Sequence, residues 1–158
     1  MTSNRSKAIV LIVDDEPGVR ALQRRILEGG GYDVIEAGDG SEAVAIIEGS
    51  ARVDFLIADL DMPVMQGEEM AKRIRARRPD LRVLYVTAHS ERLFRERPEL
   101  INGEAFLDKP FTSRGLLEAV SLLKTGFIGT PPPRPLSGMR RLWNAVTGAD
   151  RRDPHGQS

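Results

Sequence analysis

Five short apolar stretches that alternate with helical patterns constrain the fold of this chain more than any other feature. The predicted strands are residues 7–13, 32–37, 53–58, 81–86 and 104–107. Consecutive apolar positions indicate strands that are buried on both faces, and strands that alternate with helices form parallel sheets. The sequence therefore predicts an α/β fold in which helices cover both faces of a five-stranded parallel sheet.

The helical segments between these strands differ in how clearly they are marked. The first follows Pro17, and its apolar residues Val19, Leu22 and Ile26 fall on one helical face. Later helices are expected to bury Ala43, Val44, Ile47, Met70, Ala71, Ile74, Leu116, Ala119, Val120 and Leu123. Pro98 interrupts the fourth segment, residues 90–102, because an internal proline removes a hydrogen bond and clashes with the preceding turn. We therefore expect an irregular or shortened fourth helix.

The chain divides into three parts by composition. Residues 1–126 form the expected domain, 127–138 read as a proline-rich extended linker, and 139–158 form a short tail. The tail has few apolar positions, and they share one helical stripe: Met139, Leu142, Trp143 and Val146. A docking or dimer-forming helix and a disordered tail both fit this pattern, so a homodimer stays open.

Charge and composition narrow the function classes. The formal net charge is zero, which argues against the broad basic footprint of non-specific DNA binding. The 28 residues after position 130 are too few for a separate DNA-binding module with its own core, so no DNA binding is expected. The chain has no cysteine, and its apolar runs are too short to span a bilayer. A cytoplasmic protein without membrane contact is expected.

Several predicted strands end in residues that are capable of polar chemistry. Asp14 and Asp15 follow the first strand, Asp59 the third, Thr87 the fourth and Lys109 the fifth. The carboxyl ends of parallel strands meet at one edge of the sheet, where ligands of such folds bind. Carboxylates with bound waters suit Mg²⁺. Two carboxylates ~4 Å apart repel by about 4 kcal/mol at an effective dielectric constant of about 20, so a cation, a neutralising lysine, or both are expected. The pattern predicts phosphoryl transfer, with Asp59 as the nucleophile.

Four motifs in the same order resemble the receiver domain of two-component response regulators. They are residues 13–16 (VDDE), 59–67 (DLDMPVMQG), 86–88 (VTA) and 106–111 (FLDKPF). The resemblance covers about residues 7–124. Within the family, the chain is similar to stand-alone receivers and to receivers associated with hybrid histidine kinases. It implies a flavodoxin-like (βα)5 doubly wound fold.

The resemblance also implies how the acidic residues act. Asp59 is the expected phosphoacceptor, and Asp15 and Asp59 are the expected ligands of Mg²⁺. Asp14 would act on the metal through water. Asp61 would contribute its backbone carbonyl to the metal.

Other residues are implied to bind the phosphoryl group or to carry the signal. Thr87 and Lys109 would contact the phosphoryl oxygens, and Phe106 would be the aromatic ring that swings inward when Thr87 moves. The implied donor is a phosphohistidine on a sensor histidine kinase or a histidine phosphotransfer domain. The chain would then be a stoichiometric phosphoacceptor rather than an enzyme, apart from self-catalysed phosphotransfer and autodephosphorylation, and would signal through protein contacts.

Two other functions remain open from the sequence. The order Asp59-Leu60-Asp61 after an apolar strand also resembles the nucleophile and acid pair of haloacid-dehalogenase-type phosphatases. Those enzymes place the motif near the N-terminus, whereas here it follows the third strand. The third possibility is a receiver-like interaction module that takes no phosphate, although all the site residues are present.

Overall fold

The computed structural model describes residues 6–49, 51–60, 67–89 and 104–125. The elements in chain order are β1 (Ile9–Val13), α1 (Pro17–Gly29), β2 (Asp33–Ala37), α2 (Gly40–Glu48), β3 (Phe55–Asp59), α3 (Gly67–Arg77), β4 (Arg82–Thr87), β5 (Glu104–Asp108) and α5 (Ser113–Thr125). All five predicted strands are confirmed, and their ends differ from the prediction by at most two residues.

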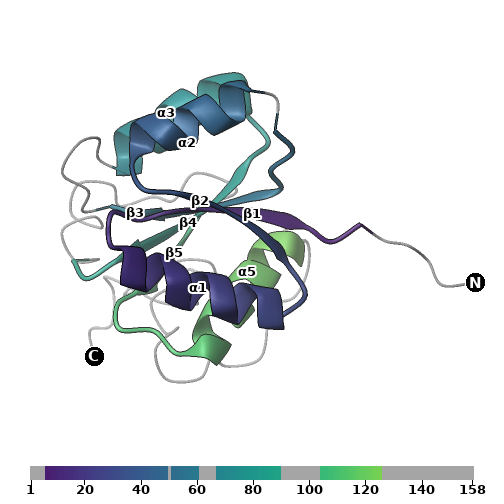
Figure 1. Cartoon of the computed structure of the whole chain (residues 1–158), viewed down its shortest axis with the longest axis vertical. Helices are drawn as coiled ribbons and strands as arrows, with labels where there is room; N and C mark the ends of the chain where they lie inside the picture. Colours follow the sequence, from purple (N-terminus) through teal and green to yellow (C-terminus); the bar gives the residue numbers. More distant parts are fainter. Residues whose placement is uncertain (1–5, 50, 61–66, 90–103, 126–158) are drawn as a thin grey trace, which may run out of the picture.

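The five strands form one parallel sheet in the order β2-β1-β3-β4-β5. The chain runs from β1 to the β2 edge and then returns past β1 to β3, so the direction of winding reverses between β1 and β3. In Figure 1, α2 and α3 cover one face of the sheet, while α1 and α5 cover the other. The doubly wound, flavodoxin-like fold is thus confirmed.

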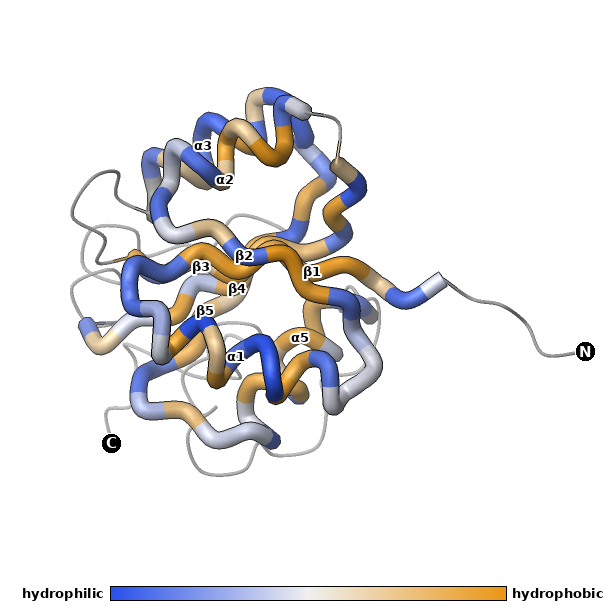
Figure 2. Tube along the Cα trace, viewed as in Figure 1, coloured by the Kyte–Doolittle hydropathy of each residue, from blue (hydrophilic) through white to orange (hydrophobic). Residues whose placement is uncertain are grey.

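The core consists of two apolar layers, one on each face of the sheet. One layer joins the sheet to α2 and α3, and the other joins it to α1 and α5. The strands appear as a hydrophobic centre in Figure 2, with hydrophilic segments beyond their ends. The positions expected to be buried in α2, α3 and α5 are confirmed except for Val44, which packs only partly against its layer.

Helix α1 differs from its prediction. Its buried residues are Gln23 and Leu27, whereas Leu22 is 51% exposed and Val19 and Ile26 are intermediate. The helix is therefore rotated so that a polar residue faces the interior. An apolar stripe alone does not reveal this rotation, because the polar residue Gln23 is not counted among the positions that define the stripe.

Helix α2 begins with a reciprocal set of hydrogen bonds that shapes the end of β2. The Asp39 carboxylate accepts from the backbone N–H of Glu42 at 2.8 Å, and the Glu42 carboxylate accepts from the N–H of Gly38 at 2.8 Å. Side chains at these positions satisfy backbone donors that the first turn of a helix leaves unpaired. The turn after β2 is thereby fixed beside the carboxyl ends of the strands.

Several sequence predictions concern residues outside the described ranges. They include Asp61, the Pro98 segment, the linker and the tail. None of the helices within the described ranges is long and apolar enough to cross a membrane.

Candidate functional site

Buried polar side chains gather at the carboxyl ends of the strands. Among the described residues, the buried polar ones are Asp14, Gln23, Asp59 and Thr87, and all but Gln23 lie at this edge. Val13 of β1 is level with Ala58 of β3, so the next residues, Asp14 and Asp59, are neighbours across the two strands. Each is almost fully buried, at 1% and 5% exposure. Burial of charged groups requires partners.

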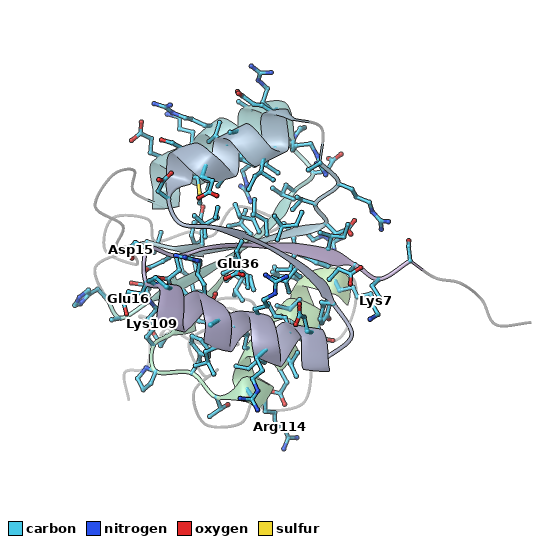
Figure 3. All side chains as sticks on the ribbon, viewed as in Figure 1. Lys7, Asp15, Glu16, Glu36, Lys109 and Arg114 are labelled. Carbon is cyan, nitrogen blue, oxygen red and sulfur yellow. The ribbon has the colours of Figure 1, made fainter. Side chains whose placement is uncertain are left out.

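Lys109 supplies the positive charge at this edge. Its Nζ lies 3.2 Å from Oδ2 of Asp59 and 3.4 Å from Oδ2 of Asp14, so one ammonium bridges the two buried carboxylates. Partial burial lowers the pKa of Lys109, but the charges of Asp59 and Asp14 outweigh this effect and leave the pKa raised. Figure 3 shows Asp15, Glu16 and Lys109 together at one end of the sheet, with Lys7 at the opposite end.

Asp14 is held by contacts on all of its polar groups. Oδ1 accepts from the backbone N–H of Glu16 at 2.9 Å, and Oδ2 accepts from Lys109. Its backbone N–H donates to the carbonyl of Ala37 at 3.3 Å, and its own carbonyl accepts from Nη1 of Arg20 at 2.6 Å. Burial raises the pKa of Asp14, and the charge of Asp59 adds to this effect, although the Glu16 and Lys109 contacts act in the opposite direction.

The three carboxylates at this edge fit a hard divalent cation. Asp14, Asp15 and Asp59 each offer an oxygen, and these oxygens lie within 4.8 Å of one another. Asp15 is exposed, so an ion could keep bound waters on that side. Lys109 balances only one of the three negative charges. Oxygen ligands, open access and uncompensated negative charge are features that suit Mg²⁺.

The last residue of β4 places a hydroxyl at the same edge. Thr87 is 1% exposed and is level with Asp108 of β5. Its Oγ1 accepts from the backbone N–H of His89 at 3.0 Å, and its carbonyl accepts from the N–H of Lys109 at 2.9 Å. These bonds fix Thr87 relative to Lys109, the next site residue along the edge.

Phe106 is buried in the layer that joins the sheet to α2 and α3. It is level with Tyr85 of β4, and the two rings stack with their centroids 5.2 Å apart and an interplanar angle of 25°. Neighbouring positions of parallel strands place side chains on the same face, which accounts for this contact. The Phe106 ring, which is expected to swing inward, is therefore already buried in this structure.

Sequence reasoning misses two residues near the site. Arg20 contacts the Asp14 carbonyl from α1, and Tyr85 supports Phe106. Tyr85 could have been found, because it lies two residues before Thr87 in a buried strand. Arg20 carries a weaker signal, since nothing in the sequence separates it from the neighbouring arginines 24 and 25.

Comparison with known proteins agrees with this geometry. The family model described as "Response regulator receiver domain" matches residues 10–121. The sensor kinase CckA of Brucella abortus (strain 2308) is 34% identical over 120 residues, which are 75% of this chain and 13% of that protein. The alkaline phosphatase synthesis transcriptional regulatory protein PhoP of Bacillus subtilis (strain 168) is 31% identical over 123 residues, or 77% of this chain and 51% of that protein.

A solved structure is similar over the same region. The response regulator TrrA of Thermotoga maritima, in complex with Mg²⁺-BeF, has a TM-score of 0.63 at 33% identity, and the match covers 73% of this chain and 98% of that one. The chain thus spans a small part of CckA and about half of PhoP. The fold, the strand-end carboxylates and the family match agree, and the chain belongs to the response regulator receiver domain family.

Proposed function

We propose that Asp59 accepts a phosphoryl group from a phosphohistidine and that the resulting acyl phosphate is the signal. The observation that carries this proposal is the position of Asp59. Its carboxylate lies at the end of a central strand, 3.2 Å from Lys109 and beside the carboxylates of Asp14 and Asp15. A nucleophile, a fixed positive charge and ligands for a cation are the parts that phosphoryl transfer requires.

In the proposed reaction, a carboxylate oxygen of Asp59 attacks the phosphorus in line with the bond to the imidazole nitrogen. That bond breaks, and its electron pair leaves with the imidazole. The Lys109 ammonium stabilises the negative charge that develops on one phosphoryl oxygen, and the Thr87 hydroxyl donates to another. Both groups are fixed before the donor arrives, so little reorganisation is needed.

The carboxylates of Asp15 and Asp59 would hold Mg²⁺, with Asp14 acting through water and Asp61 through its backbone carbonyl. When bound, Mg²⁺ neutralises charge on the phosphoryl oxygens. TrrA, a relative at 33% identity, was solved with Mg²⁺-BeF, which supports a comparable site here. The donor would be a sensor histidine kinase or a histidine phosphotransfer domain, in line with the similarity to part of the sensor kinase CckA.

Output would pass through protein contacts of the domain, with Phe106 as part of the switch. The chain would act as a stoichiometric acceptor and not as a phosphatase that turns over substrate.

We further propose that the chain consists of a domain at 1–126, a linker at 127–138 and a tail at 139–158, and that the tail mediates partner binding or self-association. Deletion of residues 131–158 should then change the oligomeric state, as measured by solution mass, or the affinity for a partner. An unchanged oligomeric state together with an unchanged affinity would remove the role of the tail.

Incubation with acetyl phosphate and Mg²⁺, followed by intact mass measurement, tests the proposed reaction. Wild type should gain the mass of one phosphoryl group, whereas the Asp59→Asn variant and wild type in EDTA should not. Continuous release of phosphate from a generic phosphate ester would instead indicate a phosphatase. A persistently unmodified wild type would indicate an interaction module that takes no phosphate.

A further inference from the structure

Arg20 links the acidic edge to strand β2 from the first turns of α1. Its Nη1 donates to the backbone carbonyl of Asp14 at 2.6 Å, and its Nε lies 3.6 Å from Oε1 of Glu36. The Arg20 side chain is only 20% exposed. In Figure 3, Glu36 lies between the sheet and α1, where it can anchor this guanidinium. One side chain therefore fixes a carbonyl at the edge and is itself held by an ion pair.

The carbonyl that Arg20 holds belongs to the peptide that joins Asp14 to Asp15. Within the described part of the chain, the Asp15 carboxylate makes no hydrogen bond, whereas both carboxylate oxygens of Asp14 have donors. The direction of the Asp15 side chain thus depends on its backbone. Fixing the plane of the preceding peptide restricts that backbone, because the peptide unit is rigid and rotates as a whole.

Glu36 also pairs with a second arginine, which provides an internal comparison. Nη1 of Arg24 lies 2.5 Å from Oε2 of Glu36, and Nε of Arg24 lies 2.9 Å from Oε1 of Glu28. Arg24 therefore carries the same charge and shares the same anchor as Arg20, but its contacts are with Glu36 and Glu28 rather than with Asp14.

Charge and positioning predict opposite effects of removing Arg20. A positive charge near three carboxylates repels a divalent cation, so its loss through electrostatics alone would tighten metal binding. Loss of the contact with Asp14 would instead free the peptide that orients Asp15 and would weaken binding. The sign of the change separates the two roles.

We infer that Arg20 is a positioning residue for the metal site: it fixes the Asp14–Asp15 peptide and so preorganises Asp15 for a divalent cation. This inference rests on the proposed function, because it assumes that the carboxylates bind Mg²⁺. Residues that orient metal ligands without touching the metal commonly change metal affinity by about 10-fold or more when they are replaced. Arg20 fits that role through a backbone carbonyl rather than through a ligand side chain.

Titration of the full-length, unphosphorylated protein with MgCl₂, followed by calorimetry or amide chemical shifts, tests this role. Arg20→Gln should bind Mg²⁺ about 10-fold more weakly than wild type. Arg24→Gln, the matched control, should bind as wild type does or slightly more tightly. Circular dichroism at the titration temperature confirms that each variant is folded.

Arg20→Lys separates charge from geometry and also serves if Arg20→Gln does not fold. Lysine keeps the charge but lacks the planar fork that reaches Asp14 and Glu36 together. It should therefore bind Mg²⁺ more weakly than wild type. If Arg20→Gln binds Mg²⁺ as tightly as wild type or more tightly, the positioning role is overturned and the proposed function stays intact. If Arg20→Gln does not fold, the same result in Arg20→Lys has the same meaning. Failure of wild type itself to bind Mg²⁺ would overturn both the inference and the metal site.

Discussion

Replacing Asp59 by asparagine should stabilise the metal-free domain, although it removes the proposed phosphoacceptor. The carboxylate of Asp59 is attracted by Lys109 and repelled by Asp14 and Asp15. At an effective dielectric constant of about 20, the attraction across 3.2 Å is worth about 5 kcal/mol. Each repulsion, between oxygens within 4.8 Å of each other, is worth about 3.5 kcal/mol or more on the same scale.

The two repulsions together exceed the attraction by about 2 kcal/mol. Asp15 is exposed, so water screens its share and we expect a net gain of about 1 kcal/mol. For a domain of this size, that corresponds to a rise in melting temperature of about 4 °C. The measurement is thermal and urea unfolding of wild type and Asp59→Asn in EDTA. Saturating Mg²⁺ should narrow the difference, because the variant has lost a ligand and gains less from binding.

Asp54→Asn is the matched control, because Asp54 directly precedes β3 at the opposite end of that strand. Its carboxylate accepts from the N–H of Ile9 at 2.8 Å and pairs with Arg52 at 3.3 Å. The same change of charge at this paired site should give no gain in stability. If Asp59→Asn lowers the melting temperature in EDTA, attraction to Lys109 outweighs the repulsion, and the reasoning from crowded carboxylates is refuted.

Three further predictions concern buried polar groups. Lys109→Met should lower the free energy of unfolding in EDTA by about 3 kcal/mol, because it leaves two buried carboxylates without their positively charged partner. Adding Asp59→Asn should restore part of this free energy in urea unfolding. No recovery would contradict the bridging role of Lys109. Because the folded pKa of Asp14 is raised, its contribution to stability is present below its ordinary value of 3.8 and is lost as pH rises through the folded pKa. The stability of wild type relative to Asp14→Asn should thus fall from pH 4 upward in EDTA, and a constant difference would refute this. Oε1 of Gln23 has no hydrogen-bond partner in the described structure, so Gln23→Met should raise the free energy of unfolding by about 1 kcal/mol. Destabilisation would indicate that the amide has a partner.

The sequence predicts the sheet and the members of the site because both follow from simple periodicity. Five apolar runs determine the strands, and the polar residues directly after them must meet at one edge. The contacts that bring Asp14, Asp59 and Lys109 together follow from strand register, which continuous apolar runs do not specify. Strand order itself comes from the resemblance to receiver domains.

Sequence patterns are less informative where a polar side chain takes a core position or acts through the backbone. The rotation of α1 depends on how its whole surface packs against the sheet and α5, so Gln23 is buried while Leu22 is exposed. Arg20 acts through a carbonyl, and such a contact leaves no pattern of residue types. Tertiary packing therefore decides these details, and local spacing does not.

The most direct test of the central claim is chemical identification of the phosphorylated residue. Full-length protein is phosphorylated with a histidine phosphotransfer donor and Mg²⁺, and any acyl phosphate is reduced with borohydride before peptide mapping. We predict that position 59 alone is converted to homoserine and that the Asp59→Asn variant yields no converted peptide. Conversion at another carboxylate, or a converted peptide in Asp59→Asn, would contradict Asp59 as the phosphoacceptor.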